Sequence, residues 1–283
     1  MTETFLSIVT VNMNHRDGLR RTRDSVLANI SPDIEWIVVD GGSTDGSVEL
    51  LQADVPQHTR WISEPDSGVY EAMNKGWKLA TGTFVLFLNS GDVLVDGEVL
   101  GKMRHRLCEG RADLYYGDAF RRNHRQEWVE IRYPDPLNLS QFYLGGLCHQ
   151  AEFFRREVLE RLSGYNETYR IGGDWELLVR MLLACAVTEH VPFPIVYYEG
   201  GGLSQKQVEQ REREKLRMYA ESVPPAVHRD MKSLVLAREE AYRLRELDQW
   251  VKQIRNRNVL VNMAMVLKWS LQKTCEPRKE RKK

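Results

Sequence analysis

The chain has 283 residues, and its 40 lysines and arginines are balanced by 40 aspartates and glutamates. This balance excludes the strong basic excess typical of nucleic-acid-binding domains, and we expect no nucleic-acid partner. Hydrophobic residues make up 42% of the chain, which is ordinary for a globular protein, and the length is sufficient for one large α/β domain with an appendage.

The cysteines and the N-terminus indicate a cytoplasmic protein. The four cysteines are far apart and form no CxxC pair, which favours reduced thiols over a disulfide framework or a zinc site. Residues 5–11 begin an apolar strand pattern at once, without the basic and long apolar regions of a signal peptide. No uncharged apolar run reaches the ~20 residues that would span a bilayer.

Strand and helix patterns alternate in the first half of the chain. Strands separated by helices indicate βαβ units with right-handed crossovers, and therefore an α/β fold. We expect strands over residues 5–11, 34–39, 59–62 and 83–88, and helices over 18–28, 47–52 and 69–79.

The pattern changes after residue 113. We expect strands over 114–120 and 127–132, which pair with each other, then a strand over 150–154, helices over 157–162 and 174–186, and a strand over 192–198. Beyond residue 204 the composition shifts to long charged helix formers. There Leu244, Leu247, Val251 and Ile254 have the spacing of a short coiled-coil seam or of a helix packed on the body. We therefore predict a domain over 1–205 and a helical extension over 206–283.

Two apolar strands end in carboxylates. The run 34–39 ends in Asp40, and the run 83–88 leads into Asn89-Ser90-Gly91-Asp92. Open α/β sheets bind ligands at the C-terminal ends of their strands. Asp40 can accept a hydrogen bond from a nucleobase or a ribose, or it can cap its own turn. Asp92 suits a Mg²⁺ or Mn²⁺ ion bridging a diphosphate, or it caps a turn.

A third polar segment covers residues 64–76. Asp66 and Ser67 can cap a helix whose N-terminal N–H groups attract anions. Asn74 and Lys75 lie two turns further along this helix. Lys75 can meet a phosphate, although a lone lysine on a helix is more often solvated.

The predicted helix 174–186 opens with two acidic residues. Acidic residues in a first turn are favourable by themselves, but one of them can also serve as a general base. Asp174 and Glu176 point to different sides of the helix, so at most one should face a substrate. Glu176 has the spacing to pair with Arg180. Further upstream, His149 can bind a phosphate or an acceptor, ligate a metal, or be structural.

Taken in chain order, these motifs resemble one family. The chain is similar to family 2 glycosyltransferases of the GT-A fold, in which a mostly parallel, Rossmann-like sheet flanked by helices binds a nucleotide-sugar. Within that family it looks most like the bacterial enzymes of colanic acid and related exopolysaccharide biosynthesis. The resemblance covers roughly the first two-thirds to three-quarters of the chain. Its motifs are SIVTVN from Ser7, VVDGGSTDG from Val38, SEPDSGVY from Ser63, AMNKG from Ala72, LNSGD from Leu88, HQA from His149 and GDWE from Gly173.

The resemblance implies roles for particular residues. Thr10 and Asp40 match nucleotide-binding positions, Asp92 matches the metal-binding aspartate of the DxD-type motif, and Asp174 matches the catalytic base. The remaining expected nucleotide-sugar contacts are Asp66, Asn74, Lys75, Asn89, Gly91 and His149.

The chain departs from the family pattern at three positions. Gly41 and Gly91 stand where many members have a second aspartate, and Glu71 stands where an aspartate is common. The usual contact to the nucleobase is therefore weakened. The metal is expected to bind less tightly or to need another ligand.

The resemblance implies an inverting, metal-dependent transfer from a UDP- or GDP-sugar to a saccharide acceptor, with Asp174 as the base. A nucleotidyltransferase-like enzyme is a second hypothesis, but residues 12–16 contain no GxGxxG or GxxxxGKS/T phosphate loop. A non-catalytic GT-A scaffold of a polysaccharide complex is a third, and the departures at Gly41 and Gly91 keep it open.

The C-terminal residues suggest a place of action. Residues 259–271 are largely apolar and are flanked by basic residues, so as a helix they can lie in a headgroup region. The segment 256–283 would then hold a peripheral protein on the inner face of the cytoplasmic membrane, near a lipid-linked acceptor. Alternatively it packs against the catalytic domain or against a second subunit in a homodimer.

Overall fold

The computed structural model describes residues 4–56, 59–123, 125–139, 142, 146–198 and 207–255. The chain divides into two compact units, Met1–Arg229 and Asp230–Lys283. Helix α9 (Val208–Ser222) thus belongs to the first unit. The functional boundary that we predict at residue 205 lies in a segment outside the described residues and stays a prediction.

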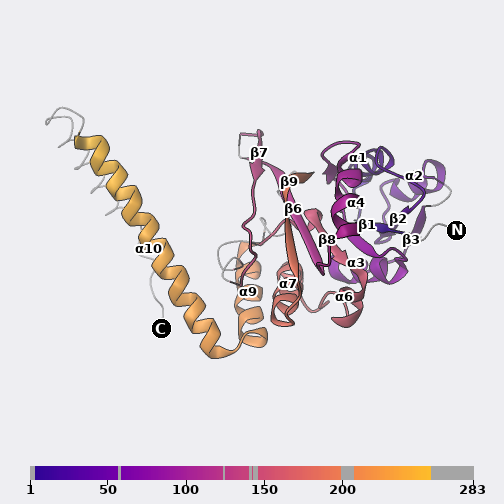
Figure 1. Ribbon diagram of the computed structural model, residues 1–283. Coiled ribbons are helices and arrows are strands. Elements are labelled where there is room, and N and C mark those ends of the chain that lie inside the picture. The colour runs from indigo at the N-terminus through magenta and orange to yellow at the C-terminus, as the bar shows by residue number, and fades with distance from the viewer. Residues whose placement is uncertain are drawn as a thin grey trace. The chain divides into compact units, whose positions relative to one another are not determined.

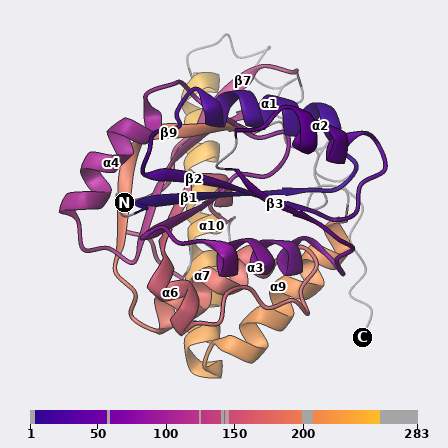
Figure 2. The same cartoon turned by 90° about the vertical axis from the view of Figure 1, so that its right-hand side faces the viewer.

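Four parallel strands form the N-terminal half of the sheet, in the order β3-β2-β1-β4. Helices α1 and α2 cover one face of these strands and α3 covers the other (Figure 2). All the predicted elements of this half are present, and α3 has the predicted bounds. The elements are β1 (Leu6–Asn12), α1 (Arg16–Leu27), β2 (Ile34–Asp40), α2 (Ser47–Ala53), β3 (Arg60–Ser63), α3 (Val69–Leu79) and β4 (Phe84–Phe87).

The C-terminal half of the sheet is mixed. Strand β8 is antiparallel to both β4 and β6, and β9 is parallel to β6. Strand β5 pairs with β9, and β7 pairs with β6. Strands β8, β6 and β9 lie side by side in Figure 1. The predicted pairing of strands 114–120 and 127–132 is confirmed by β6 and β7. The elements are β5 (Val93–Leu94), α4 (Val99–Glu109), β6 (Leu114–Arg122), β7 (Trp128–Ile131), the 3₁₀ helix η1 (His149–Ala151), β8 (Glu152–Arg155), α6 (Arg156–Arg161), α7 (Gly173–Leu183) and β9 (Thr188–Tyr198).

Three differences from the predicted elements have local causes. Helix α4 was not predicted, although its buried residues Val99, Met103 and Leu107 follow a helical spacing. The strand predicted from residue 150 begins at Glu152, because residues 149–151 form a 3₁₀ turn. Helix α7 ends three residues before the predicted end, because Cys185 adopts a left-handed conformation that a helix does not continue.

The core lies on both faces of the sheet. Every residue of β1 and the last five residues of β2 are buried, as expected of parallel strands covered on both sides. The apolar run therefore continues to the C-terminal ends of the strands, where Asn12 and Asp40 follow it. The predicted α/β sheet flanked by helices is confirmed, and it brings the polar strand ends to one edge.

The second unit is described by its part of α10 (Pro225–Arg255). Of the four predicted seam positions, Leu244 and Leu247 are exposed, and all four lie on this helix. Among the described residues, no helix has both the length and the apolarity to cross a bilayer. The segment that we predict to lie on a membrane, 256–283, is outside the described residues.

Candidate active site

Asp40 organises the ends of the first three strands. Its carboxylate is fully buried and accepts five hydrogen bonds from the described residues. The donors are Asn12 Nδ2 (2.7 Å), the Gly42 and Ser43 N–H groups (3.1 and 2.8 Å), Ser43 Oγ (2.6 Å) and Ser63 Oγ (2.7 Å). Burial by itself raises the pKa of Asp40, but these hydrogen bonds outweigh it and hold the pKa below its usual value. Asp40 thus caps its own turn, and its contact with a nucleotide stays a prediction.

Two other residues that we predict to contact the nucleotide-sugar, Thr10 and Asn74, have side chains that are hydrogen-bonded within the fold. The Thr10 hydroxyl is buried and accepts a hydrogen bond from the Trp36 indole at 2.9 Å. The Asn74 amide is buried. Its Nδ2 donates to the backbone carbonyl of Tyr165 and to Glu167, and its Oδ1 accepts from the Tyr165 N–H and the Trp77 indole. Their contact with a nucleotide stays a prediction, while in this structure both side chains pin distant segments together.

The N-terminus of α3 differs from the expected cap. The Ncap residue of α3 is Gly68, so neither Asp66 nor Ser67 occupies the capping position. Instead Glu71 accepts hydrogen bonds from the N–H and hydroxyl of Ser67, at 2.7 and 2.5 Å. The prediction of capping by Asp66 and Ser67 was therefore wrong, because a glutamate in the first turn reaches back to the loop.

Lys75 is held by two carboxylates. Its Nζ lies 2.9 Å from a carboxylate oxygen of both Glu64 and Glu71, and it also donates to the Pro65 carbonyl. The two glutamates, Glu64 first, raise the pKa of Lys75. A contact from Lys75 to a phosphate would have to compete with them.

The turn Asn89–Asp92 follows β4 and is fastened to α1. The Thr22 hydroxyl donates to the carbonyls of Asn89 and Asp92 and accepts from the Gly91 N–H. Gly91 has φ +105°, a conformation that side chains rarely adopt, and a Cβ there would lie 2.9 Å from the His15 ring. His15 in turn bonds the Ser90 carbonyl through Nδ1 at 3.1 Å. Gly91 thus shapes the turn through its backbone.

Adjacent residues of η1 contact the predicted metal-binding aspartate, Asp92, and the predicted base, Asp174. Gln150 Nε2 donates to Asp92 Oδ2 at 2.9 Å, and His149 Nδ1 lies 3.7 Å from Asp174 Oδ2. The other nitrogen of His149 contacts Asn89 Nδ2 at 3.0 Å. Burial lowers the pKa of His149 to about 4, so the imidazole is neutral at physiological pH. Hence the structure brings Asn89, Asp92, His149 and Asp174 into one site.

Asp174 lies in the first turn of α7. Its side chain is 16% exposed, and its Oδ1 accepts hydrogen bonds from Tyr70 Oη (3.2 Å) and from the Trp175 N–H. Burial, opposed by these hydrogen bonds, raises the pKa of Asp174 to about 6. Glu176 faces elsewhere and pairs with Arg180 at 2.7 Å, as its spacing predicted.

Two glutamates that the motifs did not indicate lie near this base. Glu214 of α9 accepts hydrogen bonds from three successive N–H groups, of Arg170, Ile171 and Gly172, just before α7. Glu152 of β8 is 1% exposed, and its carboxyl oxygens have no hydrogen-bond partner among the described residues. Burial, and then the charge of Asp174, raises the pKa of Glu152 well above its ordinary value. Sequence could not indicate these roles, because they depend on contacts between distant elements.

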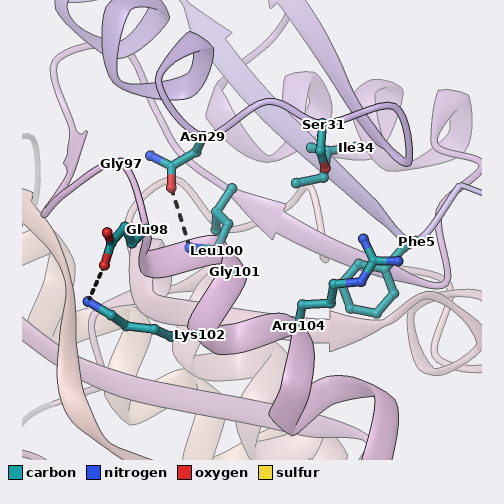
Figure 3. A pocket seen from close by; sticks show the side chains of 10 residues that line it. All are labelled: Phe5, Asn29, Ser31, Ile34, Gly97, Glu98, Leu100, Gly101, Lys102 and Arg104. Carbon is teal, nitrogen blue, oxygen red and sulfur yellow. Dashed lines mark hydrogen bonds and ion pairs between the residues drawn. The ribbon is translucent and has the colours of Figure 1, made fainter.

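A cavity of about 560 Å³ lies at the opposite edge of the sheet, where β1 and β2 begin (Figure 3). Phe5, Ile34 and Arg104 are among its lining residues, and Arg104 stacks over the Phe5 ring. The carboxylates Asp40, Asp92 and Asp174 do not line it. It is therefore separate from the site at the strand ends.

The comparison with known proteins supplies the family. The model of glycosyl transferase family 2 matches residues 7–163. The chain belongs to glycosyl transferase family 2. It is 32% identical over 224 residues to a PGL/p-HBAD biosynthesis glycosyltransferase of Mycobacterium bovis, which spans 77% of this chain and 86% of that protein. An uncharacterized glycosyltransferase of Mycobacterium tuberculosis, Rv1514c, is 34% identical over 183 residues, 64% of this chain and 70% of that protein.

Two solved structures have a fold similar to that of this chain. The mannosyltransferase PcManGT of Pyrobaculum calidifontis, in complex with GDP-Man and Mn²⁺, has a TM-score of 0.62 at 15% identity and covers 96% of this chain and 81% of its own. S. aureus TarS 1-349 in complex with UDP-GlcNAc has a TM-score of 0.59 at 16% identity, with 80% and 69% covered. The predicted GT-A fold is thereby confirmed.

Proposed function

We propose that this family 2 glycosyltransferase performs an inverting transfer, with Asp174 as general base and a divalent cation at Asp92. The single observation that carries the proposal is the dipeptide His149-Gln150, which contacts both carboxylates at once. Because His149 and Gln150 are consecutive residues of η1, they link the turn that carries Asp92 to the first turn of α7, which carries Asp174.

The chemical step needs a base that is ionised yet able to take a proton. With a pKa of about 6, the Asp174 carboxylate is mostly ionised at pH 7.5 and is a stronger base than an exposed aspartate. It takes the proton of an acceptor hydroxyl as the oxygen forms a bond to the anomeric carbon. The bond from that carbon to the diphosphate breaks, and its electron pair leaves with the diphosphate. A positioned base contributes roughly 10²–10⁴-fold.

His149 and Tyr70 would orient this base. The Tyr70 hydroxyl shares its proton between the Ile171 carbonyl (2.6 Å) and Asp174 Oδ1 (3.2 Å), which leaves Oδ2, on the side of His149, for the acceptor proton. Because His149 is neutral, it adds no positive charge that would lower the pKa of Asp174. The loop before α7 is fixed by Glu214, which keeps Asp174 in place.

The residues of the Asn89–Asp92 turn fit a Mg²⁺ or Mn²⁺ ion. Such ions usually take one or two carboxylates together with substrate phosphates. Asp92 supplies the carboxylate, and Asn89 Oδ1 is a buried oxygen without a hydrogen-bond partner among the described residues. Those residues contain no group of three or more histidine, cysteine or acidic side chains arranged for a metal, so the diphosphate would complete the shell. When bound, the ion would stabilise the charge of the departing diphosphate.

The donor would be a UDP- or GDP-sugar and the acceptor a lipid-linked saccharide of a bacterial surface polysaccharide. The names of PcManGT and TarS record GDP-Man and UDP-GlcNAc complexes, and that of the mycobacterial relative records PGL/p-HBAD biosynthesis. The two complexes support a nucleotide-sugar donor, and the lipid-linked acceptor follows from the resemblance to enzymes of surface polysaccharide synthesis. The protein would act in the cytoplasm, and residues 256–283 would hold it at the inner face of the membrane. Alternatively, these residues would pack against a second subunit in a homodimer.

Flotation with anionic liposomes tests the membrane hypothesis. The full chain should float, and a chain without residues 256–283 should not, because each basic residue near an anionic leaflet contributes ~1 kcal/mol. A truncated chain that floats equally well would contradict the assignment.

Release of nucleoside diphosphate tests the proposed activity. The full chain, mixed with UDP- and GDP-sugars, Mn²⁺ and lipid-linked acceptors, should release UDP or GDP only when donor and acceptor are both present. A non-catalytic scaffold would release neither, and a nucleotidyltransferase that passed on the nucleoside monophosphate of the donor would release a sugar 1-phosphate instead. A thermal-shift screen of nucleotide-sugars identifies the donor first, because a bound ligand raises the apparent stability.

A further inference from the structure

Helix α9 (Val208–Ser222) places a carboxylate where packing alone would favour an apolar residue. The helix packs against α7 and lies beyond the residues that the family model matches (Figure 1). Its buried residues are Glu214, Met218 and Tyr219, so Glu214 lies on the face that is turned toward the fold. A carboxylate in such a place costs stability unless hydrogen bonds compensate for its burial. The charge at position 214 therefore has a reason beyond packing.

The hydrogen bonds of Glu214 supply that reason. Its Oε1 accepts the Arg170 N–H at 3.0 Å, and its Oε2 accepts the Ile171 and Gly172 N–H groups, both at 2.9 Å. Successive N–H groups that converge on one anion form a nest, which fixes the backbone that carries them. Gly172 is the Ncap residue of α7, and Asp174 follows two residues later. Glu214 thus fixes the beginning of the helix that carries the proposed base.

Helix α9 also holds the residues just before this nest. Arg217 Nη2 donates to Thr168 Oγ1 at 3.0 Å, and the Arg217 guanidinium lies 4.6 Å from the centre of the Tyr169 ring. The Tyr169 hydroxyl donates to Glu221 at 3.3 Å. From Glu214 to Glu221, about two turns of one helix are therefore attached to residues 168–172.

Helix α3 holds the same segment through Tyr70. The Tyr70 hydroxyl lies 2.6 Å from the Ile171 carbonyl and 3.2 Å from Asp174 Oδ1. A Cβ at Gly173 would lie 2.7 Å from the Tyr70 ring, so glycine leaves the space that the ring needs. The backbone at Ile171 is therefore bonded to α9 through its N–H and to α3 through its carbonyl.

The charge of Glu214 also acts on Asp174. Burial by itself raises the pKa of Glu214, but hydrogen bonds from the three N–H groups and from Gln210 outweigh it and hold the pKa below its usual value. Glu214 is therefore ionised at neutral pH. Burial is the main cause of the raised pKa of Asp174, and the negative charge of Glu214 raises it further. The other titratable groups around Asp174 have pKa shifts that favour their neutral forms, and they are His149 of η1, Tyr70 of α3, Tyr165 and Glu152 of β8.

We infer that Glu214 is a positioning residue of the transfer reaction, which fixes the place of Asp174 through the backbone of residues 170–172 and strengthens it as a base through its negative charge. This inference rests on the proposed function, in which Asp174 is the base. It extends the catalytic apparatus to α9, outside the residues that the family model matches.

Amide hydrogen exchange of the full chain tests the geometry without any ligand. The N–H groups of residues 170–172 should be protected in the wild type. Glu214→Gln keeps the size of the side chain but turns an NH₂ group toward N–H donors, so exchange over residues 168–176 should quicken roughly tenfold or more. The matched control is Glu212→Gln, which removes an exposed carboxylate paired with Arg211 on the same helix and should exchange as the wild type does.

Kinetics test the effect on the base, with the donor and acceptor that the nucleoside diphosphate release assay identifies. Glu214→Gln should lower kcat roughly 10- to 100-fold through misplacement of Asp174, with a donor Kd near that of the wild type. It should also move the acid limb of kcat/KM to lower pH, because Asp174 loses a neighbouring negative charge. Tyr70→Phe removes a hydrogen-bond donor to Asp174 and should move the same limb to higher pH. A general loosening of the site would instead expose Asp174 to water and lower the limb in both variants.

Glu214→Asp separates position from charge. It keeps a carboxylate but is one methylene shorter, so it cannot reach all three N–H groups and should lower kcat as well. Thermal unfolding verifies the fold of each variant, and either substitution at position 214 tests the inference by itself.

Three results would overturn the inference. The first is a wild-type kcat in either variant of Glu214, and the second is unchanged amide exchange over residues 168–176 in Glu214→Gln. The third is an acid limb that stays in place in Glu214→Gln, or that shifts in the same direction in Tyr70→Phe. In all three cases the wild type still transfers sugar, and the proposed function stands. A wild type that releases no nucleoside diphosphate refutes the proposed function instead.

Discussion

The buried carboxyl of Glu152 makes folding stability depend on pH in a predictable direction. Glu152 has a raised pKa in the folded chain, because burial and the neighbouring Asp174 disfavour its ionised form. In the unfolded chain its pKa is about 4.3. Between these two pKa values the folded state binds more protons than the unfolded state, so stability falls as the pH rises.

The expected magnitude follows from the proton count. One extra bound proton changes the free energy of unfolding by about 1.4 kcal/mol per pH unit. From pH 5 to pH 8 this contribution reaches at most about 4 kcal/mol if Glu152 stays protonated throughout. Glu152→Gln keeps the shape of the neutral carboxyl and cannot ionise. It should therefore be more stable than the wild type at pH 8 and nearly equal to it at pH 4.5.

Urea unfolding at pH 4.5, 6, 7 and 8 measures the difference between the two proteins. Asp174 also has a raised pKa, but it titrates in both and cancels from the comparison. The matched control is Glu157→Gln, an exposed glutamate five residues along the chain, which should leave the pH dependence unchanged. Parallel stability curves for wild type and Glu152→Gln would refute the reasoning, because Glu152 would then titrate alike in both states.

The remaining predictions concern the site. Asp174→Asn should lower kcat by about two to four decades and leave the donor Kd nearly unchanged, because the amide cannot accept a proton. A larger kcat defect in Glu176→Gln would mean that Glu176 is the base. The wild-type kcat/KM should fall as the pH drops through about 6, the pKa of Asp174, and a descent only near pH 4 would mean that the base is a different, exposed carboxylate. Asp92→Ala should abolish metal-dependent transfer and leave the fold intact, and normal turnover at limiting Mn²⁺ would contradict the metal assignment. Asn74→Ala should cost about 3 kcal/mol of stability, since it strands buried partners around Tyr165, and a loss of donor affinity without a loss of stability would instead favour direct contact.

The first half of the fold could be predicted because its signals are local. The strands of β1 and β2 read as unbroken apolar runs, since they are covered on both faces. Helix α3 was predicted with its observed bounds. The elements of the second half were harder to predict. The 3₁₀ turn at His149 and the left-handed conformation of Cys185 depend on packing and not on the spacing of apolar residues.

The sequence by itself determined the family and the α/β fold, and it indicated a candidate site, since strand ends, turn glycines and acidic residues are visible as motifs. It could not decide which polar side chains remain available to a ligand. Asp40 and Asn74 match the motif as well as Asp174 does, yet their acceptors are consumed by partners up to 91 residues away. The raised pKa of Asp174 and the burial of Glu152 likewise depend on packing and on hydrogen-bond partners from other elements. Those exist only once the strands have been brought together, so only the tertiary structure decided them.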